Sequence, residues 1–170
     1  MILDAADALA EAIKEVTKDL SMPDTTGGSG APDVYNGFVP KARRGQSEPR
    51  IPFVVVRIED GTDAETENGA YNTTMQAMII IGCKRETDEE GYRDVVTIVE
   101  KIRRRFLSAP VFGGRYRAER PIDWRISDDE TWPNWYGVMT IPVVIPQPME
   151  LDSVEDEGLV YGQAYPSGRA

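Results

Sequence analysis

The segment FVVVRIEDGTDAETENGAYNTTMQAMIIIGCK, residues 53–84, decides the fold because it contains two strand patterns joined by a polar turn. Phe53–Glu59 is a β-branched run bounded by Pro52 and Gly61, which predicts a central strand. Tyr71–Lys84 ends in a nearly continuous apolar run, typical of a strand that is buried on both faces or lies beside a helix. The acidic segment between the two runs predicts the loop of a hairpin.

A helix is predicted directly after this hairpin. Thr87 followed three residues later by Glu90 fits a capping box, in which a hydroxyl and a carboxylate bind backbone amides that would otherwise be unpaired. Pro110 cannot continue a helix and sets its end. The predicted apolar face carries Tyr92, Val95, Val96, Val99, Ile102 and Phe106. The opposite face carries Arg93, Lys101, Arg103, Arg104 and Arg105.

The chain before the hairpin predicts one further helix. Residues 2–20 repeat apolar side chains at spacings of three and four, which indicates an amphipathic helix that ends at Ser21–Pro23. Residues 23–32 (PDTTGGSGAP) and 40–52 (PKARRGQSEPRIP) are predicted to be flexible loops, the second of them basic. Residues 34–38 (VYNGF) fit a short strand or a turn.

Two further strand signals follow the second helix. Residues 113–126 (GGRYRAERPIDWRI) predict a turn and then a strand, and residues 135–146 (WYGVMTIPVVIP) predict a last strand. Pro142 and Pro146 cannot donate ladder hydrogen bonds, and proline in a strand indicates an edge or a break. We therefore expect the last strand at a sheet margin, protected from pairing by its prolines or covered by a neighbouring subunit. From Met149 the chain is acidic and aperiodic, which predicts a tail at 149–170 that is flexible until bound.

The order helix, strands, helix, strands predicts a single α+β domain over residues 1–148. We expect an antiparallel or mixed sheet of about four strands with two amphipathic helices packed on one face. An α/β sandwich with a parallel strand pair is the alternative, because a helix between two strands also permits a parallel crossover.

Composition restricts the function. The net charge of −10 argues against a general affinity for nucleic acid, whose phosphates such a surface repels. Cys83 is the only cysteine, so neither an intramolecular disulfide nor a zinc-binding cysteine cluster is expected, and burial in an apolar strand would make its thiol inert. No segment resembles a signal peptide or approaches the roughly 20 apolar residues of a membrane span.

The absence of histidine excludes Ser-His-Asp and Cys-His nucleophile systems and histidine-ligated metals. The remaining candidates are carboxylates in two acidic runs, at 59–67 and 128–130, which are more typical of solvated loops than of a metal site. A carboxylate-dependent metal enzyme built from Asp60, Asp63 and Asp128 is therefore the remote alternative. We expect no enzyme activity, no cofactor and no metal.

A family resemblance is carried by the succession of residues 81–117, 121–126 (PIDWRI) and 132–146 (WPNWYGVMTIPVVIP). It resembles the tail terminators, or tail completion proteins, of long-tailed siphophages of Gram-positive bacteria. The matching motifs are a PFVVVR strand at 52–57, a Gly-Tyr-x-Asp motif at Gly91, Tyr92 and Asp94, an arginine motif at Ile102–Arg105, and the late aromatics Trp132, Trp135 and Tyr136. The resemblance covers roughly residues 1–147, and the order of the motifs carries it.

The resemblance implies a structural role in the virion. Such proteins form a hexameric ring on the head-proximal end of the tail tube, stop tube growth and offer a surface to the head–tail connector. The implied partners are copies of the chain, the tail tube protein and a connector protein, with DNA passing through unbound and no membrane contact. The implied location is the head–tail junction, after assembly in the host cytoplasm. Another ring-forming head–tail joining protein, such as a neck stopper or connector adaptor, is the nearer alternative.

Different faces of such a subunit must bind different partners, because a subunit complementary to the tube on one face only acts as a cap. The candidate subunit or tube contacts are Arg43, Arg44, Arg103, Arg104, Arg105, Trp132, Trp135 and Tyr136. The candidate lumen or partner-facing acids are Asp60, Asp63, Glu65, Asp128 and Asp129. Core packing is the competing role for the aromatics: we expect it for Trp124, Tyr92 and Phe106 and leave it open for Trp132 and Trp135.

Overall fold

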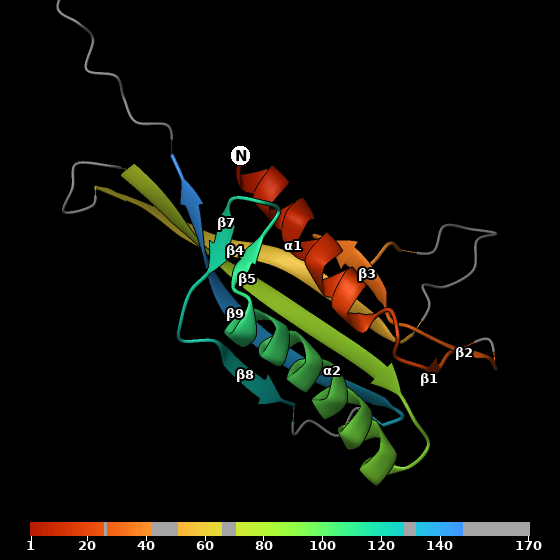
Figure 1. Ribbon diagram of the computed structural model, residues 1–170. Helices are drawn as coiled ribbons and strands as arrows, with labels where there is room; N and C mark the ends of the chain where they lie inside the picture. Colours follow the sequence, from red (N-terminus) through yellow and green to blue (C-terminus); the bar gives the residue numbers. More distant parts are fainter. Residues whose placement is uncertain (26, 42–50, 66–70, 128–131, 148–170) are drawn as a thin grey trace, which may run out of the picture.

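The hairpin predicted at residues 53–84 forms the centre of the sheet. The computed structural model describes residues 1–25, 27–41, 51–65, 71–127 and 132–147. Strand β4 (Phe53–Glu65) pairs antiparallel with β5 (Tyr71–Lys84), with a β-bulge between Ile58 and Asp60. Strand β5 then pairs with β9 (Asn134–Pro146) through thirteen consecutive residue pairs, from Asn72–Pro146 to Lys84–Asn134. The strand at the centre of the sheet is therefore paired on both sides (Figure 1).

The sheet has more strands than the four expected. Within the described residues it has seven, in the order β3-β4-β5-β9-β7-β6, with β8 also paired to β9. Strand β3 (Asp33–Asn36), at the predicted short strand or turn, runs parallel to β4, so the sheet is mixed. The strand predicted within 113–126 is two strands, β7 (Tyr116–Ala118) and β8 (Asp123–Ile126), and β6 (Val111–Phe112) pairs with β7. The α+β class is confirmed, and the strand count was too low.

Two segments predicted to be loops are partly strands. The glycine-rich segment contains a small hairpin of β1 (Met22–Pro23) and β2 (Ser29–Gly30), in which the Gly28 amide donates to Asp24 Oδ1 at 2.9 Å. The acidic segment after Glu59 continues β4 as far as Glu65. Its side chains pair across the hairpin with a threonine-rich stretch of β5, and threonine favours strands.

The prolines of the last strand do not place it at the sheet edge. Strand β9 lies between β5 on one side and β7 and β8 on the other. The carbonyl of Pro142 accepts a hydrogen bond from the Glu119 amide at 2.7 Å, so the proline nitrogen faces that same side. There β7 has ended at Ala118 and β8 has not begun. The missing donor therefore falls at a break in the pairing, and the position expected for this strand at the sheet margin was wrong.

Both helices pack on one face of the sheet, as expected (Figure 1). Helix α1 (Ile2–Thr17) contacts β3 and β4, helix α2 (Asp88–Ser108) contacts β5 and β9, and the two helices contact each other. Thr87 is the N-cap residue, but its hydroxyl hydrogen-bonds the Glu90 carboxylate at 2.9 Å and no side-chain bond reaches a backbone amide. The predicted helix start is confirmed, and the predicted capping-box bonds are wrong.

The core lies between the helices and the sheet. Side chains from alternate positions of the central strands fill it, among them Met75, Ile79 and Ile81 of β5 and Met139 and Ile141 of β9. Phe106 of α2 is buried there, as predicted. Tyr92 is 52 % exposed and Trp124 is also 52 % exposed, so the core positions expected for both were wrong. Tyr92 falls at the start of α2 and Trp124 on the short strand β8, beyond the main layer of the core.

The alternate positions of the same strands form a second sheet face, called the helix-free face below, which carries no helix from the described residues. Ile79 is fully buried under the helices, whereas its neighbour Ile80 points to the helix-free face and is half-buried.

Substitution of each of these two isoleucines by alanine compares the stability contributed by the two faces, because the same side chain is shortened in both variants. We expect Ile79→Ala to lower the free energy of unfolding by about 2–5 kcal/mol and Ile80→Ala by less than half as much, measured by urea denaturation of the isolated chain. Equal losses would show that the helix-free face is covered in the isolated chain.

Candidate interaction surfaces

The arginine cluster of α2 is held by carboxylates and carbonyls of its own helix end. Glu100 accepts from Arg103 Nη2 at 2.7 Å and from Arg104 Nη2 at 2.9 Å. The hydrogen bonds from Arg103, and next those from Arg104, hold the pKa of Glu100 below its usual value. Arg104 is nevertheless 77 % exposed. This pair of arginines thus stands on the surface of α2 in a fixed arrangement around one carboxylate.

Arg105 braces the end of the helix. Its guanidinium donates to the carbonyl oxygens of Ala109 and Val111, and it lies 5.4 Å from the ring centroid of Phe106. Carbonyls at a helix C-terminus lack intrahelical donors, and a cation there also complements the helix dipole. The arrangement of Arg105 therefore suits both the carbonyls and the dipole at the end of the helix. No carboxylate within the described residues forms an ion pair with Arg105.

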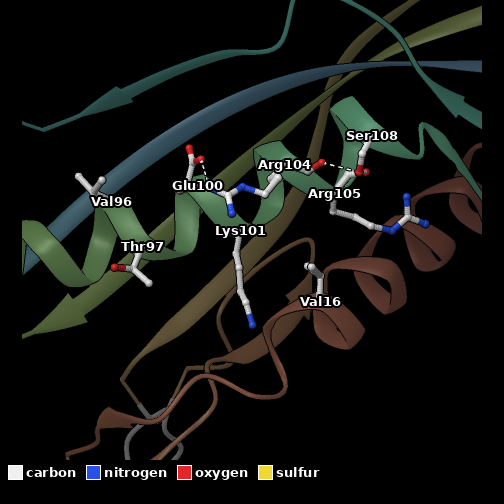
Figure 2. A pocket seen from close by; sticks show the side chains of 8 residues that line it. All are labelled: Val16, Val96, Thr97, Glu100, Lys101, Arg104, Arg105 and Ser108. Carbon is white, nitrogen blue, oxygen red and sulfur yellow. Dashed lines mark hydrogen bonds and ion pairs between the residues drawn. The ribbon is translucent and has the colours of Figure 1, made fainter.

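A groove runs between α1 and α2. It has a volume of about 560 Å³ and is lined by Val16 of α1 and by Val96, Lys101, Arg104 and Arg105 of α2, together with the Glu100 carboxylate and the hydroxyl side chains of Thr97 and Ser108. Figure 2 shows Lys101 and Arg105 extending from α2 toward the α1 side of the groove. The groove therefore combines apolar walls with a cationic rim.

The start of α2 is fixed to the last strand through the Gly-Tyr-x-Asp motif. A Cβ at Gly91 would lie 2.1 Å from the ring of Trp135, so only glycine leaves room for this indole. Asp94 accepts from Arg85 Nε at 2.6 Å, and this hydrogen bond raises the pKa of Arg85. Two residues of the motif thus have packing roles, while Tyr92 points to solvent. Nothing in the sequence alone had paired Gly91 with Trp135.

The two late tryptophans behave differently. Trp132 is 60 % exposed and donates from Nε1 to the carbonyl of Glu86 at 3.1 Å. Trp135 is partly buried against the core, and its indole nitrogen has no acceptor within the described residues. Of the pair whose role was left open, Trp135 therefore packs internally and Trp132 remains available for contact.

The helix-free face of the sheet is an apolar surface built from the central strands. The register places Phe53, Val55 and Arg57 of β4 beside Gly82, Ile80 and Met78 of β5, and Tyr136 and Val138 of β9 next to those. Phe53 lies over Gly82, where a Cβ would approach its ring to 2.5 Å. A hollow of about 640 Å³ on this face is lined by Phe38, Phe53, Val55, Arg57 and Ile80, with Val39, Pro40 and Lys41.

Phe38 was not among the predicted contacts. It is 72 % exposed, and the Arg57 guanidinium lies 4.5 Å from its ring centroid and donates to the Gly37 carbonyl at 3.3 Å. The signal that could have found this face was the run of apolar residues at the end of β5, which fills both faces of a strand. The sequence shows this apolar run, but it does not show that helices pack on only one face of the strand.

The predicted acids lie apart from one another. Asp60, Asp63 and Glu65 are exposed on the outer half of β4. Asp60 pairs across the hairpin with Gln76, and Asp63 pairs with Thr73, whose hydroxyl donates to it. The alternation of a strand therefore sends Asp60 and Asp63 to opposite faces. Within the described residues no group of three or more metal-ligating side chains comes together.

Several predicted positions lie outside the described residues. These are Arg43, Arg44, Asp128 and Asp129, and also the tail at 149–170, so the domain boundary at 148 stays a prediction. Among the described helices none is long and apolar enough to cross a membrane.

Cys83 is a buried free cysteine, as expected. Burial raises the pKa of its thiol to about 12, with a further contribution from the nearby Asp94 carboxylate. A thiol with such a pKa is neutral at physiological pH and is a poor nucleophile. Its inert role is therefore consistent with its surroundings.

Comparison with known proteins gives no family for this chain. No family model matches it, and no curated protein matches it. Among solved structures it is similar to a chain in the virion of a native gene transfer agent particle, with a TM-score of 0.44 and 11 % identity, over 84 % of this chain and 94 % of that chain. At this TM-score the likeness assigns no function to the chain.

The contact between Gly91 and Trp135 gives a direct test of the site. Gly91→Ala should lower the free energy of unfolding by about 1–3 kcal/mol or more, because the added methyl group collides with the indole. Urea denaturation followed by tryptophan fluorescence measures the loss. The double variant Gly91→Ala/Trp135→Leu removes the collision and should lose less than the sum of the two single variants. Strict additivity of the two losses would contradict the contact.

Proposed function

We propose that this chain is a structural protein of a phage virion that caps the head-proximal end of the tail tube. The order of its motifs resembles that of siphophage tail terminators, and the described fold is an α+β unit with two helices on one side of a mixed sheet. Its partners are further copies of itself in a ring, the tube protein below and a connector protein above. It performs no chemistry, and DNA passes it without being held.

The single observation that carries this proposal is the helix-free face of the sheet. The chain covers one face of its central strands with two helices and leaves Phe38, Met78, Ile80 and Val138 on the other. Contiguous apolar surface of this kind marks interaction sites in proteins that are soluble as subunits. A cap also needs at least two different contact surfaces, and the groove between the helices is a second one.

The charge of the chain fits the passage of DNA. Adhesion to phosphates is mainly a cationic effect, and the chain carries a net charge of −10. On the outer half of β4 the described side chains include Glu59, Asp60, Asp63 and Glu65 and no cation. Such a surface tolerates DNA nearby without binding it.

Deletion of the gene from the phage that encodes it tests the function. Without a cap, tube polymerisation has no stop, so electron microscopy of the lysate should show tails of irregular, extended length that are detached from filled heads. Expression of the chain in trans is the control and should restore joined particles of normal tail length.

Two outcomes would contradict the proposal. Tails of normal length together with heads that leak DNA would indicate a neck protein instead. Particles of normal length and normal yield would remove a structural role at this junction altogether.

A further inference from the structure

The groove between α1 and α2 holds three cations and one carboxylate, Glu100, and two of the cations have no carboxylate partner among the described residues. Lys101 forms no ion pair with any described residue. Arg105 donates its hydrogen bonds to the backbone carbonyls of Ala109 and Val111, which are neutral groups and do not compensate its charge. Arg104 stands beside them and shares Glu100 with Arg103. Figure 2 shows these side chains around one hollow whose far wall is Val16 of α1. On a chain with a net charge of −10, this concentration of positive charge marks a binding surface for an acidic partner.

An acidic element is present on the same chain. The outer half of β4 carries Glu59, Asp60, Asp63 and Glu65, and the facing residues of β5, Tyr71–Gln76, carry no charge. Beyond Val56 no described strand pairs with the outer edge of β4, since β3 pairs only with Phe53–Val56. In Figure 1 this end of the hairpin projects past the layer of helices. Because β5 pairs with β9 on its other side here, this acidic half of β4, called the ribbon below, is an exposed strand at the edge of the sheet with its outer edge unpaired by any described strand.

The groove and the ribbon belong to different regions of the molecule. The groove opens beside Val16, at the C-terminal end of α1, and along the second half of α2. The ribbon lies at the distal end of the central hairpin, and the described contacts of α2 with the sheet are with β5, β8 and β9. A basic groove on one side and an acidic ribbon elsewhere are the two halves of a head-to-tail contact, which closes into a ring when the rotation permits.

We propose that the groove between α1 and α2 of one copy receives the acidic outer half of β4 of a neighbouring copy. The outer edge of β4 enters the groove, so Lys101, Arg104 and Arg105 lie beside acids from both faces of this strand, Asp60 on one face and Glu65 on the other. Val16 and Val96 contact the apolar atoms of the strand. This inference rests on the proposed function, because it assigns the contact that joins subunits within the ring. The remaining helix-free face of the sheet is left for the tube or connector.

Carbodiimide cross-linking tests the contact directly. The reagent joins a lysine amine to a carboxylate without adding atoms between them, so it reports ion pairs in contact. Equal amounts of ¹⁴N- and ¹⁵N-labelled full-length chain should give mixed-isotope cross-links between Lys101 and Asp60, Asp63 or Glu65. Mixed-isotope cross-links from Lys101 only to other segments, or none at high protein concentration, would overturn the proposal.

A charge exchange tests the energetics. The groove variant Lys101→Glu/Arg104→Glu leaves Arg105 and its bonds to the helix end in place. The ribbon variant Asp60→Lys/Glu65→Lys leaves the bond between Asp63 and Thr73 in place. Each variant alone should associate at least about tenfold more weakly than the original chain in sedimentation equilibrium, because like charges then face each other. An equimolar mixture should associate again, since each groove then meets a ribbon of opposite sign.

The matched control is Arg93→Glu/Arg117→Glu, which reverses the same number of exposed cations away from the groove. It should associate as the original chain does, and circular dichroism should show the same fold for all variants. If the mixture fails to associate while the original chain does, or if the control weakens association equally, the proposed contact is wrong. A chain that forms rings unaffected by these changes would refute this inference and leave the cap function standing, whereas normal tails after gene deletion would refute the function itself.

Discussion

The structure depends on strand β5, which is paired along its length with β4 and β9 and covered on only one of its faces. Alternate side chains of β5, among them Met75, Ile79 and Ile81, meet the two helices and close the core. Near the C-terminal end of β5 the opposite face is apolar as well, because Met78 and Ile80 alternate with the core residues and point away from the helices. Among the described residues, two helices cover one face and no helix covers the other. The proposed function follows from this apolar face.

Close side-chain contacts also fix the position of α2. Gly91 admits the Trp135 ring, Gly82 admits the Phe53 ring, and Arg85 binds Asp94, so the helix and the last strand are fixed to the central hairpin by close contacts. The three arginines in the second half of α2 also form hydrogen bonds. Arg103 and Arg104 bind Glu100, and Arg105 binds a backbone carbonyl after the helix. After these contacts are formed, the groove between α1 and α2 still has an excess of positive charge. The proposed neighbour contact uses that charge without disturbing the fold.

Local patterns predicted the helices and the central hairpin, because periodicity and stop signals such as Pro110 act within a few residues. They predicted too few strands, because β6, β7 and β8 are two to four residues long and gain their order from pairing with one another and with β9. Trp124 and Tyr92 were placed in the core on residue type, and their exposure is decided by distant neighbours. Among the candidate contacts, Trp135 is used internally, whereas Phe38 gave no signal in the sequence. Which side of a strand receives helices is a property of the whole chain, so the helix-free face became visible only with the tertiary structure.

The central claim is that this chain is a virion subunit at the junction of tail and head, with faces built for neighbours. Gold-labelled antibodies against the chain, applied to intact particles and to tails released from heads and imaged by electron microscopy, test it most directly. The account predicts label at a single position on each particle, the head-proximal end of the tail, which becomes more accessible once heads are removed. Label along the tube, on the capsid or at the distal tip, or particles without any label, would contradict the account.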